Sequence, residues 1–449
     1  MKYEMLDLGD HVINYAESLG AEQVEVYFES TRTIEVNIEK GAIRLAAENF
    51  DTGCGIRVAI GNQIGLSYVT SHLEADMDLA TQDAINAAKA SVPDPDFHSF
   101  ASVSSSYPSV RGLFDSSIDQ IDSDKAVDMI SRAVQASKEI SGKERNLIEG
   151  GFTAESKTKA IVNSLGTTIS SSETKTNLDV SSTIGIGNEQ CSSWYDYSSR
   201  TLAEIKPEEI GTRSARNALA LRGAKSMDGG EMPLILTPCA LWSVLGRGLV
   251  PALNARQIQD GKSYLIDSLG ALIAHPELEI VDSGIMPDAY GSHMFDAEGV
   301  PSQKTSLISS GVLKSHLHDS YSSAKDDVPS TGNATRSSYR VSPNIGSTNL
   351  VVTPGVSTLD EMISDLKRGV MCTFTFDRPN FVTGELSAMI MEGFLIENGE
   401  IQHALKNALF GVTMQDLMKK ATIVGSEVES RENVITPPIF IDSVRITSG

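Results

Sequence analysis

The segment Ala59-Ile60-Gly61-Asn62-Gln63 is the starting point for predicting the fold of the first half of the chain. It returns in weaker form, 126 residues later, as Gly185-Ile186-Gly187-Asn188-Glu189. In the first copy, apolar runs at residues 56–60 and 64–69 flank Gly61-Asn62. Both turn residues tolerate a positive φ, so the pattern predicts two antiparallel strands joined by a tight hairpin. The second occurrence indicates that a larger unit has been duplicated.

The elements around the first hairpin define that unit. Apolar residues at helical spacing predict a helix that ends at Gly20. Alternating apolar residues then predict strands at 24–28 and at 34–38. After the hairpin, a second helix is predicted at about residues 76–90. The unit is therefore a sheet that has one helix before it in the chain and one after it.

The same order of elements returns after a linker rich in proline and serine. A helix is predicted at about residues 124–140, strands follow, and a further helix begins at Pro207, because proline suits a first helical turn. We therefore predict an N-terminal α+β domain over residues 1–225. Its two weak repeats cover about 1–92 and 110–225.

Residues 226–449 have a different character, with many glycine turns and short strand patterns. Glu397-Asn398-Gly399-Glu400 predicts another tight hairpin. Helices are predicted after Thr237-Pro238 and after Ser357-Thr358, where Glu361 completes a capping box. The predicted fold class is α+β, with a duplicated helix–sheet–helix N-terminal domain followed by a mostly antiparallel, β-rich C-terminal domain.

Composition excludes several classes of function. Lys and Arg total 37 and Asp and Glu total 59, which gives a net charge of −22 and argues against binding to nucleic acid. No apolar run reaches the roughly 18 residues that a transmembrane helix needs, and the first residues lack the pattern of a signal peptide. The scattered cysteines Cys54, Cys191, Cys239 and Cys372 are typical of reduced thiols. We expect a cytoplasmic protein.

Most catalytic signatures are absent from the sequence. No G-x-S-x-G motif occurs, which argues against a serine nucleophile of the α/β-hydrolase type. Gly261-Lys262-Ser263 resembles the end of a phosphate-binding loop, but Arg256 stands where that motif needs its first glycine. A short structural loop is the favoured interpretation of this segment.

Three small clusters remain as candidate sites. His316 and His318 lie two apart on a predicted strand, which would place both rings on one face as weak candidates for a metal site. Cys239 lies in a first helical turn, where a thiolate is favoured, although a small buried side chain is the preferred interpretation. Asp296 and Glu298 could act as paired carboxylates, but a turn capped by Asp296 is favoured.

The second half also carries an ordered series of short motifs. They are Phe295-Asp296-Ala297-Glu298-Gly299-Val300-Pro301, Gly311-Val312-Leu313-Lys314, Ser330-Thr331-Gly332-Asn333-Ala334, Val352-Thr353-Pro354-Gly355, Val382-Thr383-Gly384-Glu385-Leu386-Ser387 and Ile423-Val424-Gly425-Ser426. This series resembles the TldD/PmbA family, once labelled modulators of DNA gyrase and regarded as peptide-processing metalloproteases. The resemblance extends over nearly the whole chain.

The resemblance implies two kinds of subunit. A TldD-type subunit carries a zinc-binding H-E-x-x-x-H helix and a later cysteine ligand, whereas a TldE/PmbA-type partner lacks them. In this sequence Gly246 and Pro251 stand in the histidine positions and Arg247 in the glutamate position. No cysteine follows Cys372. The resemblance therefore implies that this chain binds no zinc at the family's site, and that zinc belongs to the partner subunit.

The expected function is that of a non-catalytic TldE/PmbA-like subunit, which pairs with a metal-bearing TldD-like homologue to process unfolded peptides. One alternative is an independent homodimeric hydrolase that uses His316, His318 and nearby acids. Another is a peptide-binding or regulatory module without proteolysis. Neither nucleic acid nor a membrane is an expected partner.

Overall fold

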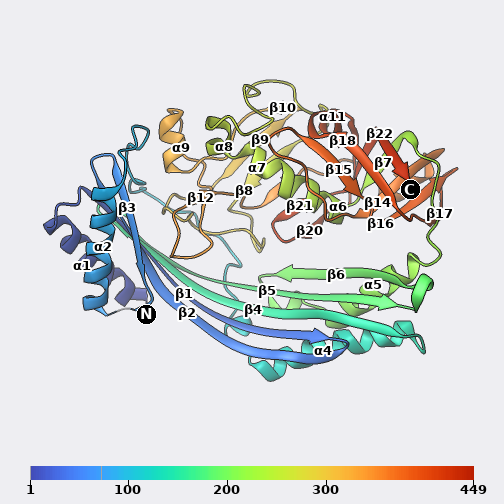
Figure 1. Cartoon of the computed structure of the whole chain (residues 1–449), viewed down its shortest axis with the longest axis horizontal. Helices are drawn as coiled ribbons and strands as arrows, with labels where there is room; N and C mark the ends of the chain where they lie inside the picture. The colour runs from blue at the N-terminus through green and yellow to red at the C-terminus, as the bar shows by residue number, and fades with distance from the viewer. Residues whose placement is uncertain (1, 72, 449) are drawn as a thin grey trace.

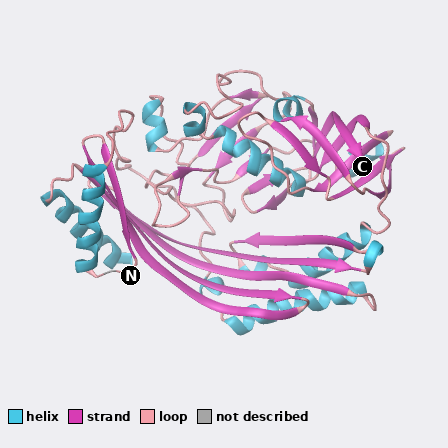
Figure 2. Cartoon of the chain, viewed as in Figure 1, coloured by secondary structure: helices cyan, strands magenta, loops and turns pink. Residues whose placement is uncertain are grey.

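Residues 2–71 and 73–448 are described in the computed structural model of the chain. The first half contains two copies of the predicted unit of helix, strands and helix (Figures 1 and 2). The first copy comprises α1 (Lys2–Ser18), β1 (Gln23–Glu39), β2 (Ala42–Ile60), β3 (Gln63–Val69) and α2 (Glu74–Ala90). The second comprises α4 (Ser123–Ser141), β4 (Asn146–Asn163), β5 (Thr168–Ile184), β6 (Cys191–Ser199) and α5 (Pro207–Ala220). The short helix α3 (Ser116–Asp119) lies between them in the chain.

The strands of both copies form a single antiparallel sheet in the order β3-β2-β1-β4-β5-β6. Each copy places its first strand at the centre, where β1 pairs with β4, and its last strand at an edge. The four inner strands have 17 to 19 residues each, or about 60 Å of extended chain. The sheet curves below the second half of the chain (Figure 1).

The two strands predicted at residues 24–28 and 34–38 are in fact one continuous strand, β1. The error has a physical reason, because the sheet has a separate core at each end. Residues 24–28 pack with α1 and α2, whereas residues 34–38 pack with α4. The polar residues 29–33 join the two cores and interrupt the apolar pattern without ending the strand.

The second half is rich in strands, as predicted (Figure 2). Its helical segments are α6 (Pro238–Leu241), the π-helix Trp242–Leu249, α7 (Val250–Leu253), α8 (Ala255–Gln259), α9 (Ser320–Lys325), α10 (Leu359–Ser364) and α11 (Met414–Lys419). Its strands are β7 (Gly230–Leu236), β8 (Ile280–Ser283), β9 (Lys304–Ser309), β10 (Val312–Leu313), β11 (Ala334–Thr335), β12 (Asn344–Ile345), β13 (Leu350–Val352), β14 (Arg368–Phe374), β15 (Glu385–Met389), β16 (Glu392–Glu397), β17 (Glu400–Ala404), β18 (Ala408–Thr413), β19 (Ala421–Val424), β20 (Glu429–Arg431), β21 (Val434–Thr436) and β22 (Ile439–Ser448).

Two larger sheets organise this half. One follows the order β15-β18-β22-β7-β14-β16-β17, with β19 paired to β22, and the other follows β10-β9-β8-β13-β21-β20. Most pairs are antiparallel, but β14 with β7 and β13 with β21 are parallel. The largest apolar core of the described residues lies between these sheets and the helices α6, α7 and α11.

Several local predictions in this half are confirmed. Asn398 and Gly399 have φ values of 53° and 79° in the tight turn between β16 and β17. Thr358 and Glu361 form the reciprocal capping box of α10. The helix predicted after Thr237-Pro238 begins at Pro238, but it changes to a π-helix at Trp242.

A buried network of charges joins the N-terminal sheet to the second half. Arg336 forms an ion pair with Glu25 of β1, and both side chains are fully buried. Arg57 of β2 lies 3.5 Å from Glu25 and also 3.5 Å from Glu298. The Arg336 guanidinium lies 4.7 Å from the centre of the Tyr27 ring. Each of these buried charges thus has an oppositely charged partner on the other half of the chain. These pairs fix the orientation of the two halves relative to each other.

Among residues 2–71 and 73–448, we find no helix with both the length and the apolar character needed to span a lipid bilayer.

Candidate functional site

The π-helix Trp242–Leu249 and the start of α7 hold the three positions at which the family resemblance implies a zinc motif. The backbone N–H of Val250 donates to the carbonyl oxygen of Leu245, five residues earlier. This hydrogen bonding stacks residues that are five apart in the chain. Gly246 and Pro251 therefore share one face of the helix, as two ligands at this spacing would have to do.

The residues at these positions do not fit a zinc ion. Glycine and proline have no ligating side-chain atom. Arg247 is a permanent cation whose Nη1 donates to the Phe376 carbonyl oxygen at 3.2 Å. A Cβ placed on Gly246 would lie 2.8 Å from Cγ2 of Val434, so a larger side chain would displace β21. The helix therefore has the geometry for two ligands five residues apart, but Val434 occupies the space that a ligand side chain at position 246 would need.

A cleft of about 270 Å³ lies next to this helix, between the N-terminal sheet and the second half. The N-terminal side supplies Trp194 and Asp196 from β6, and the other side supplies Cys239, Glu392 and Arg431. The cleft therefore lies where the two halves of the chain meet, and its walls carry both charges and aromatic rings.

Arg431 is the central charge of this cleft. Its guanidinium forms an ion pair with Asp196, and the two side chains are only 9% and 5% exposed. It also lies 4.4 Å from the Trp194 ring and 5.4 Å from the Trp242 ring. Burial raises the pKa of the Asp196 carboxyl, while the nearby Arg431 opposes that rise. A fixed cation beside the π-helix disfavours a metal ion there by charge repulsion.

Cys239 opens onto the same cleft and contacts the Arg431 guanidinium. Burial nevertheless raises the pKa of its thiol to about 12. The thiolate that a nucleophile requires is therefore rare near neutral pH. Cys239 is only partly buried, so the preferred interpretation as a small buried side chain is not met in full, but its raised pKa argues against a reactive thiolate.

The strand predicted for His316 and His318 is wrong, because these residues lie in the loop between β10 and α9. The prediction that the two rings share a face is confirmed, since their centres are 6.2 Å apart. The loop also brings in Asp326, at the end of α9. One ligand atom from each of the three residues lies within 4.8 Å of the others.

The remaining candidates are structural. Asp296 accepts hydrogen bonds from the backbone N–H groups of Glu298 and Val300, both at 2.9 Å, which confirms the predicted turn. Glu298 lies in the buried charge network, where Arg57 helps to hold the pKa of its carboxyl below the usual range against the effect of burial. Gly261 has a φ of 74° in the predicted short loop.

Sequence reasoning missed Trp194, Asp196, Arg431 and Asp326. The first three meet across more than 230 residues of chain, so no local pattern connects them. Asp326 is only eight residues from His318, and a search for acidic residues on the helix that follows the histidines would have found it.

Three family models match the chain. They describe domain 1 of the PmbA/TldA metallopeptidases over residues 24–90, the central domain over 116–222 and the C-terminal domain over 229–448. The chain is 24% identical over 428 residues to the metalloprotease PmbA of Escherichia coli O157:H7, which covers 94% of this chain and 91% of that protein. A metalloprotease TldD homolog of Buchnera aphidicola subsp. Acyrthosiphon pisum is 28% identical over 236 residues, which covers 51% of this chain and 48% of that protein.

The fold is also found in a solved structure, that of TldE from Thermococcus kodakarensis. The superposition has a TM-score of 0.90 and covers 98% of this chain and 100% of TldE. The sequence identity is 22%, so this likeness shows the fold and nothing further.

Proposed function

Since the chain belongs to the PmbA/TldD metallopeptidase family, we propose that it is a non-catalytic subunit of the TldE/PmbA type. In this proposal it pairs with a metal-bearing, TldD-like homologue, and the pair processes unfolded peptides. Zinc is bound by the homologue, and this chain contributes binding surface and part of the enclosure around the substrate.

The π-helix is the single observation that carries this proposal. It keeps residues five apart on one face, yet the residues there are Gly246 and Pro251. Arg247, at the position of the general base, is held by the Phe376 carbonyl oxygen. A scaffold that is retained while its ligands are absent is the pattern expected of a supporting subunit.

The extent of the sequence matches supports the same assignment. The PmbA relative matches along 94% of this chain, whereas the TldD relative matches along 51%. The likeness to PmbA therefore covers both the N-terminal sheet and the C-terminal half.

The N-terminal sheet offers a surface for extended peptide. β3 pairs only with residues 54–60 of β2, so residues 42–52 have a described strand partner on one side alone. Unpaired backbone groups along such an edge bind an extended chain by strand addition. Phe50 on this edge is 71% exposed, and its ring would contact an added strand.

The test is a mixing experiment. The purified chain is assayed for cleavage of an unfolded peptide alone, with a TldD-type homologue, and with that homologue after its motif glutamate is replaced by glutamine. The proposal predicts a stable complex, no cleavage by the chain alone, and more cleavage by the mixture than by the homologue alone. An Arg247→Ala variant should support the mixture as well as the wild type does.

The absence of a complex and of any gain in cleavage would refute the proposal. Cleavage by the chain alone would instead favour the independent hydrolase, for which the cluster of His316, His318 and Asp326 is the supporting observation. In that case an Asp326→Asn variant would lose the activity. Peptide binding without cleavage, even with the homologue present, would favour a binding or regulatory module.

A further inference from the structure

The loop between β10 and α9 is built so that two imidazole rings face the same way. Leu317, between the two histidines, is fully buried in the core of the second half. Its backbone N–H donates to the Leu253 carbonyl oxygen at 2.9 Å, and its own carbonyl oxygen accepts from the Ala255 N–H at 3.0 Å. With Leu317 fixed inward, the side chains on either side of it, His316 and His318, must point to the opposite side of an extended backbone.

His318 is held firmly in this position. Its backbone N–H donates to the Thr331 hydroxyl at 2.7 Å, and its carbonyl oxygen accepts from the same hydroxyl at 3.0 Å. Its Nδ1 lies 3.3 Å from the Ser322 hydroxyl. The tautomer that carries its proton on Nδ1 can donate to that hydroxyl and leaves the Nε2 lone pair free for a ligand.

His316 has no such partner. The residue is 9% exposed, and its Nε2 is buried without a hydrogen-bond partner among the described residues. A buried polar nitrogen without a partner costs free energy, so its presence calls for an explanation. A bound metal ion would satisfy this nitrogen.

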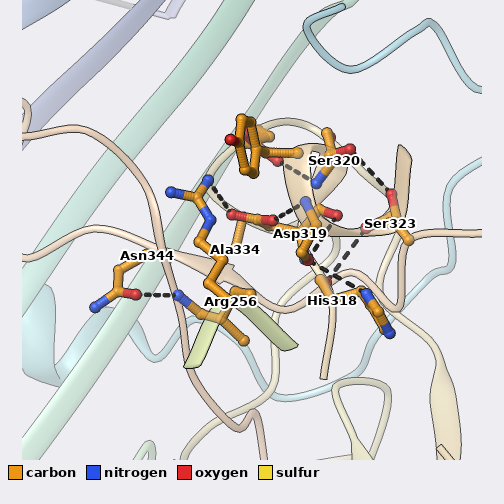
Figure 3. Close-up of polar contacts among 12 residues, drawn as sticks. Arg256, His318, Asp319, Ser320, Ser323, Ala334 and Asn344 are labelled. Atoms are coloured by element: carbon orange, nitrogen blue, oxygen red, sulfur yellow. Dashed lines mark hydrogen bonds and ion pairs between the residues drawn. The ribbon is translucent and has the colours of Figure 1, made fainter. Parts of the chain in front are cut away.

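The third group of the cluster is an exposed carboxylate. Asp326 is the C-cap of α9, and one of its carboxylate oxygens lies within 4.8 Å of a ring nitrogen of each histidine. Asp319, although adjacent to His318 in sequence, belongs to a different set of contacts. Its carboxylate caps α9 through the Ser322 N–H and forms an ion pair with Arg256 (Figure 3). The histidines therefore share Asp326, and Asp319 is already occupied.

The donor atoms select a class of metal. Two imidazole nitrogens and one carboxylate oxygen suit divalent transition ions such as Zn²⁺, Co²⁺ or Ni²⁺, whereas Mg²⁺ and Ca²⁺ prefer oxygen ligands throughout. In a tetrahedral zinc site, ligand atoms lie about 3.4 Å apart. The present limit of 4.8 Å needs a closure of roughly 1.4 Å at most between any two of the three ligand atoms. Rotation of the exposed Asp326 side chain and of the two imidazole rings supplies this closure.

We propose that His316, His318 and Asp326 form a binding site for one divalent transition-metal ion, separate from the π-helix and independent of the proposed partner role. Because Asp326 lies at the surface, a fourth coordination position is open to water. The ion ties the loop after β10 to the far end of α9.

Zinc binding to the full-length chain, purified without a histidine tag, tests this proposal. Isothermal titration with ZnCl₂ is expected to show one ion per chain, and MgCl₂ should give no binding at the same concentrations. Addition of CoCl₂ should produce the visible absorption of tetrahedral cobalt, which ZnCl₂ then removes. His316→Gln should weaken zinc binding by more than the roughly 10–100-fold that loss of an outer contact causes.

Asp326→Asn is the decisive variant, because its side chain is exposed and the change leaves packing intact. It should weaken zinc binding at least about tenfold. Asp327→Asn is the matched control, since it removes the same charge one residue away but lies outside the cluster, and it should bind zinc within twofold of the wild type. The proposal is wrong if zinc does not bind stoichiometrically, or if both aspartate variants lose affinity equally. Neither result affects the partner role, which depends on complex formation and peptide cleavage.

Discussion

Replacement of Arg431 by methionine tests whether the buried ion pair in the cleft holds the two halves of the chain together. Methionine keeps much of the shape of the side chain but removes its charge. Asp196, which is 5% exposed, would then be a buried carboxylate without an oppositely charged partner. Loss of one member of a buried ion pair costs about 3–5 kcal/mol, and a desolvated cation–π contact adds up to about 2 kcal/mol. We expect the variant to lose about 3–7 kcal/mol of unfolding free energy at pH 8.

The loss should depend on pH in a defined direction. Burial already raises the pKa of Asp196, and removal of Arg431 raises it further. An aspartate in the unfolded chain has a pKa of about 3.9. As the pH falls from 8 to 5, the folded variant binds a proton that the unfolded chain does not, so the deficit in its stability relative to the wild type shrinks. Addition of Asp196→Asn should relieve the deficit at pH 8 for the same reason.

Urea unfolding followed by tryptophan fluorescence is a suitable assay. The chain has two tryptophans, Trp194 and Trp242, and both lie against Arg431. Fluorescence therefore reports on the contact that the variant disturbs. Arg222→Met is the control, because its pair with Glu144 is about half exposed and should contribute less than about 1 kcal/mol. An Arg431→Met variant as stable as the wild type at pH 8, or one destabilised as much at pH 5 as at pH 8, would show that the ion pair does not stabilise the contact between the two halves.

Three substitutions and one labelling experiment test local features. Thr358→Ala removes the capping box of α10 and should cost about 1 kcal/mol, measured as a lower thermal unfolding midpoint. Gly211→Ala should destabilise the chain by about 1–3 kcal/mol, because the new Cβ would lie 1.9 Å from the Ala133 carbonyl oxygen between α5 and α4. Gly411→Ala meets no atom within 4 Å and should have little effect in the same thermal measurement. At pH 7.5 iodoacetamide should label Cys239 slowly in the folded protein and readily in urea, because burial raises the pKa of the thiol to about 12. The extent of labelling is measured by mass spectrometry. Rapid labelling of the folded chain would show a reactive thiolate.

Local patterns in the sequence were sufficient for much of the secondary structure. The hairpin at Gly61-Asn62, the turn at Asn398-Gly399 and the cap at Thr358 depend on contacts within a few residues, so residue type alone predicts them. The duplication was also visible, because repeated units keep the same order of helices and strands. These features do not depend on how distant parts of the chain pack.

The continuity of β1 and the loop at His316 and His318 were beyond such reasoning. β1 continues through polar residues because helices from different parts of the chain form a core at each of its ends. The loop aligns the two rings because Leu317 is fixed by Leu253 and Ala255, some sixty residues earlier. In both cases the deciding contacts join residues that are far apart in sequence.

The amino-acid sequence was enough to predict the fold class, the family resemblance and the lack of ligating side chains at the zinc motif, since each depends on residue identity and short-range order. Contacts between distant segments bring Arg431 to Asp196 and to the rings of two tryptophans, and they place Asp326 beside two histidines. Burial then set the ionisation of these groups, because the cost of removing a charge from water depends on all the atoms that surround it.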